Sequence, residues 1–289
     1  MTDLHLLVIN KISTRLNTTD LDMWRAAGLC LDSAGYIVPS NRPSDLVQMA
    51  DDMVCNALVW LVMKLVNFIA AGDDLPPEIS RLGFDVRQRP LVEYWEDLER
   101  QLDVWYSGLP DGFSPSSTVW PEDDKAGANI PKKSFIRPMY ASTMQWYHFA
   151  RIELLHNKPH IFSSVERQAS KHKPASAIAA DSPSDHHRSH ATILQQSKYH
   201  AKEIISIGFA LTDEGARVHS VQPLYAAGQV LGAQVDVSES SAKEHSALRA
   251  YVIGLLRDIE RDTGWATQYR ATQLLDQWRL PEGTSESMF

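Results

Sequence analysis

Apolar residues recur every three or four positions along nearly the whole of this 289-residue chain, and no segment alternates convincingly at period two. The clearest stripe has the spacing 4, 3, 4 and 3 and consists of Leu91, Trp95, Leu98, Leu102 and Trp105. Charged residues occupy the other faces of this segment, so the pattern predicts an amphipathic helix with both indoles in the core. Gly108 and Pro110 are expected to end that helix.

Further helices are predicted on both sides of this stripe. Ser44 can cap a helix that runs to about Ala71, and an aromatic-rich helix is expected from about Phe135 to Asn157. Beyond these, helical spacing predicts segments over residues 191–209, 224–231, 248–262 and 265–278.

Two segments interrupt the helical pattern. Residues 112–133 are dominated by proline, glycine, serine and acidic residues, which predicts an irregular connection. Residues 163–188 contain almost no large apolar side chain, and this composition predicts a disordered loop. No sequence repeat of fixed period is present. We therefore expect an all-α fold, an irregular multi-helix domain spanning residues 1–289 with two flexible insertions.

Composition and charge restrict the function. Hydrophobic residues make up 44% of the chain and charged residues 22%, the proportions of a soluble globular protein. The net charge is −8 and no dense basic block exists, so we expect no direct contact with nucleic acid and assign no DNA-binding residue. The two cysteines, Cys30 and Cys55, are too few for a multi-cysteine zinc module, and we interpret both as reduced, buried thiols.

Neither export nor membrane insertion is indicated. The apolar run from Leu6 to Ile9 lacks a basic region before it and a small-residue cleavage site after it. Residues 57–71 are apolar but shorter than the roughly 20 residues that a spanning helix needs. Lys64 and Asn67 also interrupt this stretch, so a buried core helix is favoured.

The strongest candidates for metal binding have simpler explanations. Five of the eleven histidines lie close together, at His172, His186, His187, His190 and His200. Imidazoles bind transition metals, but a closed site needs its ligands held by further hydrogen bonds, so a solvated polar loop is favoured. Glu153 and His156 form one Glu-x-x-His half-site of a di-iron bundle, and no second copy is present. We assign no metal site, no cofactor and no catalytic residue.

Motifs of the common enzyme classes are also missing. The sequence contains no G-x-S-x-G nucleophile elbow, no glycine-rich phosphate loop and no G-x-G-x-x-G dinucleotide fingerprint. From chemistry alone, the chain is a helical protein without a recognisable active site, and we expect it not to be an enzyme.

Three local patterns, taken together and in order, resemble the regulatory (middle homology) domain of fungal zinc-cluster transcription factors over roughly residues 46–280. The residues that carry the resemblance are Trp95, Leu98, Trp105, Pro110, His148, Arg151, Pro159, Pro223, Tyr225, Gly228, Gly264, Trp265 and Trp278. We interpret them as structural residues. Pro223 fits the first turn of a helix, and Gly264 is expected to end one helix before Trp265 opens the next.

The resemblance implies a nuclear or nucleocytoplasmic regulatory domain that controls transcription by binding protein partners of the transcription machinery or a small-molecule effector. The family's six-cysteine DNA-binding module is not found in this sequence. We therefore expect either a fragment of a longer protein, or a variant that works with a zinc-cluster module encoded elsewhere. Two alternatives stay open: an all-α enzyme or small-molecule-binding protein with a pocket between aromatic helices, and a scaffold that only dimerises.

Overall fold

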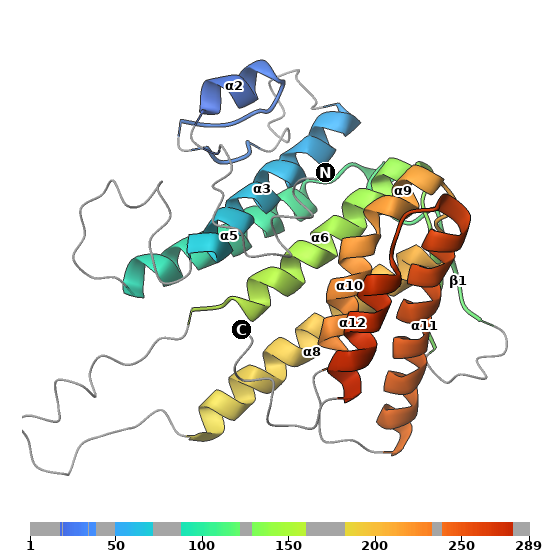
Figure 1. The fold of residues 1–289 in the computed structure, drawn as a ribbon. Coiled ribbons are helices and arrows are strands. Elements are labelled where there is room, and N and C mark those ends of the chain that lie inside the picture. Colours follow the sequence, from blue (N-terminus) through green and yellow to red (C-terminus); the bar gives the residue numbers. More distant parts are fainter. Residues whose placement is uncertain are drawn as a thin grey trace, which may run out of the picture.

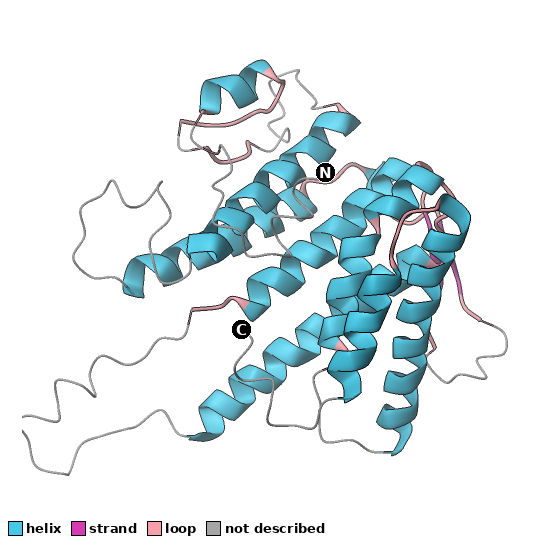
Figure 2. Ribbon diagram, viewed as in Figure 1, coloured by secondary structure: helices cyan, strands magenta, loops and turns pink. Residues whose placement is uncertain are grey.

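A computed structural model describes residues 18, 20–33, 35–38, 50–71, 88–121, 129–159, 183–232 and 239–279 of the chain. These residues form an all-α fold of several long helices, with one short pair of strands (Figures 1 and 2). The predicted fold class is confirmed.

The amino-terminal layer consists of α2 (Leu21–Ala26), α3 (Asp51–Ala71) and α5 (Gln88–Ser107), with α3 packed against α5. By length and composition α3 could cross a membrane, with a mean hydropathy of 1.9, but 67% of that stretch is buried inside the protein. Burial of this kind is typical of a core helix. The expected cap at Ser44 lies outside the described residues.

Helix α6 (Pro138–His156) lies in the middle of the molecule, and its sequence explains that position. Most of its residues are buried, including the polar side chains of Gln145 and His148. A helix with apolar side chains on all of its faces must be covered by other elements on every side. It packs against α3 and α5 on one side and against α8 (Pro183–Gly208), α9 (Glu214–His219) and α10 (Val221–Val230) on the other (Figure 1).

The carboxy-terminal helices gather around α10. This short helix contacts α6, α8, α9, α11 (Glu239–Thr263) and α12 (Gln268–Arg279). At Gly228 the approach to α12 is so close that an added Cβ would lie 2.5 Å from Leu274 Cδ1. A glycine is therefore required for this helix pair to pack as it does.

The predicted burial of the two tryptophans of α5 is confirmed. Trp95 is 3% exposed and Trp105 is 5% exposed, and both indole N–H groups are hydrogen-bonded. Trp95 Nε1 donates to the Leu154 carbonyl of α6 at 2.7 Å, and Trp105 Nε1 donates to the Val54 carbonyl of α3 at 3.0 Å. The stripe therefore joins α5 to both neighbouring helices.

Several details of the predicted elements are wrong. The connection at residues 112–133 contains a 3₁₀ turn, η1 (Asp111–Phe113), and two antiparallel strands, β1 (Ser117–Val119) and β2 (Lys132–Ser134). Helix α8 begins at Pro183, so residues 183–188 are helical rather than disordered, while residues 163–182 lie outside the described residues. The two strands were missed because three residues are too few to show an alternation of apolar and polar side chains. The start of α8 was missed because residues 183–188 are polar and show no apolar spacing.

Candidate functional site

A pocket of about 310 Å³ lies among the carboxy-terminal helices, bordered by the end of α8, by α9, by α10 and by α11. Its apolar walls include Phe209 and Tyr251, whose rings meet edge to face with centroids 4.9 Å apart and planes at 84°. Leu224 of α10 and Leu255 of α11 complete this part of the lining. Arg217, Ser220 and Asp258 share the lining, so the pocket combines apolar walls with hydrogen-bonding groups, as small-molecule sites commonly do.

Two glycines line the pocket, one in open space and one at a close contact. Gly254 lies within α11, and a Cβ added there would meet no atom within 4 Å. Gly208 ends α8, and its added Cβ would lie 3.2 Å from Leu255 Cδ1. Isolated glycines in a helical pattern cost about 1 kcal/mol relative to alanine. A glycine at 254 is not needed for close packing, and its effect is to leave space along the pocket wall.

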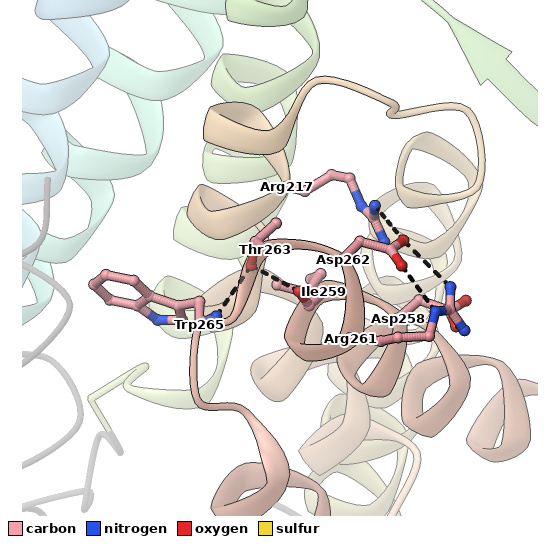
Figure 3. Close-up of polar contacts among 7 residues, drawn as sticks. All are labelled: Arg217, Asp258, Ile259, Arg261, Asp262, Thr263 and Trp265. Carbon is pink, nitrogen blue, oxygen red and sulfur yellow. Dashed lines mark hydrogen bonds and ion pairs between the residues drawn. The ribbon is translucent and has the colours of Figure 1, made fainter.

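A chain of four charged side chains lies at the border of the pocket (Figure 3). Arg217 Nη1 is 2.7 Å from Asp262 Oδ2, Arg261 Nε is 2.8 Å from Asp262 Oδ1, and Arg261 Nη1 is 2.5 Å from Asp258 Oδ1. Hydrogen bonds from Arg261 and Arg217 lower the pKa of Asp262. Two guanidinium groups thus face two carboxylates, and the border carries no net charge.

The turn between α11 and α12 continues from this border. Gly264 has a φ of +72°, which confirms that it ends α11 in the left-handed conformation. Thr263 Oγ1 donates to the Ile259 carbonyl at 2.6 Å and accepts from the Trp265 N–H at 3.2 Å (Figure 3). The expectation that Trp265 opens the next helix is wrong. Trp265 is 42% exposed in the turn, and α12 begins at Gln268.

Glu260 determines where α12 begins. Its Oε2 accepts hydrogen bonds from the backbone N–H of Thr267 at 3.0 Å and of Gln268 at 2.7 Å. These bonds satisfy donors at the start of α12 that have no partner within the helix, and they lower the pKa of Glu260.

Buried polar side chains connect the pocket to α6. Ser220, which lines the pocket, donates through Oγ to Gln145 Oε1 at 2.6 Å. Gln145 Nε2 in turn donates to the Ile204 carbonyl of α8 at 3.1 Å. This pair of hydrogen bonds fixes the junction of α9 and α10 against the centre of the molecule.

A second polar cluster lies between α6 and α8. His148 Nδ1 and His200 Nδ1 are 2.9 Å apart and share a hydrogen bond, for which one ring donates and the other accepts. Burial is the main cause that lowers the pKa of His148, and burial followed by the charge of Arg151 lowers that of His200 to about 4. The expectation that His200 belongs to a solvated loop is wrong, because its face of α8 packs on α6.

The other candidate metal ligands are not brought together. Within the part of the chain that the structure describes, no group of three or more histidine, cysteine or acidic side chains could hold a metal ion. His172 and the side chains of His186, His187 and His190 lie outside the described residues. Cys55 is buried as expected, whereas Cys30 is only partly buried.

The residues of the family resemblance fall into two groups, neither of which lines the pocket. The first group lies around α5 and α6, and its core residues are Trp95, Leu98, Trp105 and His148. Arg151 forms an ion pair with Asp103 at 2.5 Å. Pro110 precedes η1, and Pro159 follows the end of α6. The second group lies around α10, where Pro223 occupies the first turn. Trp278 Nε1 donates to the Gly228 carbonyl at 3.1 Å. The centroid of the Tyr225 ring lies 4.4 Å from Arg270 Cζ.

Sequence reasoning missed the pocket residues Gly208, Arg217, Gly254 and Asp258. The available signal was Gly254, an isolated glycine inside a strong helical pattern, which often has a packing or functional reason. The charged residues gave no signal, because a charge on a helix most often faces solvent.

Comparison with known proteins gives one informative relative. No family model matches the chain, and no solved structure matches it significantly. The chain is 37% identical over 294 residues to the transcription activator AMTR1 of Alternaria alternata, an alignment that covers 97% of this chain. The chain spans about a third of that relative's length (35%). It is thus homologous to part of a fungal transcription activator.

Proposed function

We propose that this chain is a regulatory domain of a fungal transcription activator, acting in the nucleus by binding partners rather than by catalysis. The observation that carries this proposal is the 37% identity to a transcription activator across 97% of the chain. The order of the motifs from Trp95 to Trp278 supports the same assignment through the resemblance to zinc-cluster regulatory domains.

The partners follow from charge. A chain with a net charge of −8 is repelled by the phosphate backbone, so its connection to a promoter runs through another protein or another module. The proposed partners are proteins of the transcription machinery or a zinc-cluster DNA-binding module. If a small molecule binds in the pocket, the domain would respond to an effector, and the regulatory role and the small-molecule-binding alternative would apply together.

A tethering experiment tests the regulatory role. The chain is fused to a bacterial DNA-binding domain in fungal cells that carry a reporter with the matching operator. We expect reporter expression to differ from that of the DNA-binding domain alone. The control variant Leu98→Asp places a charge in the core and should remove the difference. Expression equal to that of the DNA-binding domain alone, with the fusion protein present and nuclear, would contradict the proposal.

A further inference from the structure

We infer that the pocket between α8, α9, α10 and α11 binds a small uncharged molecule with a flat apolar body and one hydrogen-bonding end. Calling this molecule an effector rests on the proposed function, whereas the binding itself does not. Three features of the pocket lead to this ligand class: its size, the shape of its walls and the pairing of its charges.

The volume sets the size of the ligand. The pocket measures about 310 Å³, at the lower end of the range of roughly 300–1,000 Å³ found for small-molecule sites. An apolar cavity of about 150 Å³ holds one benzene molecule. The space between these helices therefore suits a molecule of one or two rings and is too small for a peptide helix.

The walls favour a flat molecule. Phe209 and Tyr251 meet edge to face, so a ligand ring can continue the same arrangement, which aromatic rings prefer over face-to-face contact. Gly254 leaves open space beside α11 where every other residue would place a Cβ, because no neighbouring helix has an atom within 4 Å of that position. This glycine costs helix stability without serving close packing, and a ligand that fills the gap would explain it.

The paired charges at the border disfavour a charged ligand. Arg217 is paired with Asp262 at 2.7 Å, and Asp258 is paired with Arg261 at 2.5 Å. An anion or a cation would have to compete with one of these ion pairs. A neutral hydrogen-bonding group does not, because a guanidinium has five N–H donors and a carboxylate about four acceptor positions, so each retains capacity beyond its pair.

Binding to the full chain tests the inference, with indole as the neutral probe and indole-3-acetate and tryptamine as its anionic and cationic counterparts. Ligand-observed saturation-transfer NMR and the thermal unfolding midpoint report binding at millimolar concentration. We expect indole to bind and to raise the midpoint, and both charged compounds to bind several-fold more weakly. Equal binding of all three compounds, or no binding of indole, would overturn the inference.

Two variants at one position locate the site. Gly254→Leu should fill the pocket and abolish indole binding, whereas Gly254→Ala occupies little space and should keep it. Tyr251→Leu removes one wall ring and serves as a second test if Gly254→Leu does not fold. It should weaken indole binding several-fold. Unchanged indole binding in folded Gly254→Leu or in Tyr251→Leu would place the probe elsewhere and contradict the inference.

The two proposals fail separately. If the tethered chain alters reporter expression but indole does not bind, the regulatory role stands and the pocket assignment is wrong. If indole binds as expected but the tethered chain has no effect on the reporter, the pocket assignment stands and the regulatory role is wrong.

Discussion

His148 and His200 share a hydrogen bond in the buried space between α6 and α8, and this bond requires that at least one of the two rings be neutral. The charged and titratable groups nearby are Lys133, Arg151, Glu203, Tyr147 and Tyr199. Glu203 is 2.6 Å from Lys133 and 3.9 Å from His148 Nε2. Glu203, the carboxylate that faces His148, thus has a closer cation, and the histidine pair gains little from becoming charged.

Because of this pair, acid should destabilise the protein in a defined range of pH. The pKa of His200 in the folded protein is about 4, below its ordinary value of 6.5, so the unfolded chain binds more protons between these values. His200 therefore has little effect on the free energy of unfolding above pH 6.5 and lowers it by about 1.4 kcal/mol per pH unit between pH 6.5 and about 4. Urea unfolding from pH 7.5 to 4.5 measures this slope. It should become shallower in His200→Gln, and an equal slope in both proteins would contradict the assignment.

Gly228 and Gly254 offer a matched pair of substitutions. In Gly228→Ala the new Cβ would clash with Leu274, which is fully buried and cannot move aside, so we expect a loss of about 1–3 kcal/mol. In Gly254→Ala the new Cβ meets nothing, and the gain in helix propensity should stabilise the protein by up to about 1 kcal/mol. Chemical denaturation of both variants checks the signs. Equal effects would mean that the approach of α10 to α12 is not tight.

At the scale of the element, α5 shows what a single stripe of apolar residues contributes. Trp95→Ala should cost about 3–5 kcal/mol, because it removes a buried indole together with its hydrogen bond to Leu154. Val104→Ala is the control on the same helix, since Val104 is 38% exposed and its substitution should cost far less than that of Trp95. If folded Trp95→Ala retained full stability, the indole would not be part of the core.

The start of α12 depends on a residue of α11. In Glu260→Ala the backbone N–H groups of Thr267 and Gln268 lose their acceptor, so the first turn of α12 should fray. Hydrogen exchange should become faster at these two amides, and the melting temperature should fall. Asp276→Ala is a suitable control, because Asp276 is exposed on the last turns of the same helix. Unchanged exchange at Gln268 would contradict the role of Glu260.

The sequence predicts elements better than it predicts the site. The stripe containing Trp95 and Trp105 could be recognised because one helix records its buried face in its own spacing. The strands at 117–119 and 132–134 could not, because three residues are too few to show alternation. The pocket forms only when α8, α9, α10 and α11 meet, and nothing within one helix indicates which of its residues will border the space between four. His200 was missed for the same reason.

At the scale of the whole molecule, net charge governs the encounter with DNA. The chain has 36 acidic and 28 basic residues, so phosphate contacts that would release counterions are few. We expect no sequence-specific binding by the isolated chain and at most weak, salt-sensitive association. A mobility-shift titration at physiological salt, with a promoter duplex and a scrambled duplex, tests this. Submicromolar binding that distinguishes the two would contradict it.

The central position of α6 has a consequence for synthesis of the protein. The ribosome releases α3, α5 and α6 before α8, α9 and α10, so one side of α6 has its partners early and the other side does not. The chain between the ends of α6 and α10 takes about 4–15 seconds to translate at 5–20 residues per second. During that interval Trp146 lacks the His219 carbonyl to which its Nε1 donates in the finished fold, and apolar surface left uncovered in this way is what chaperones bind.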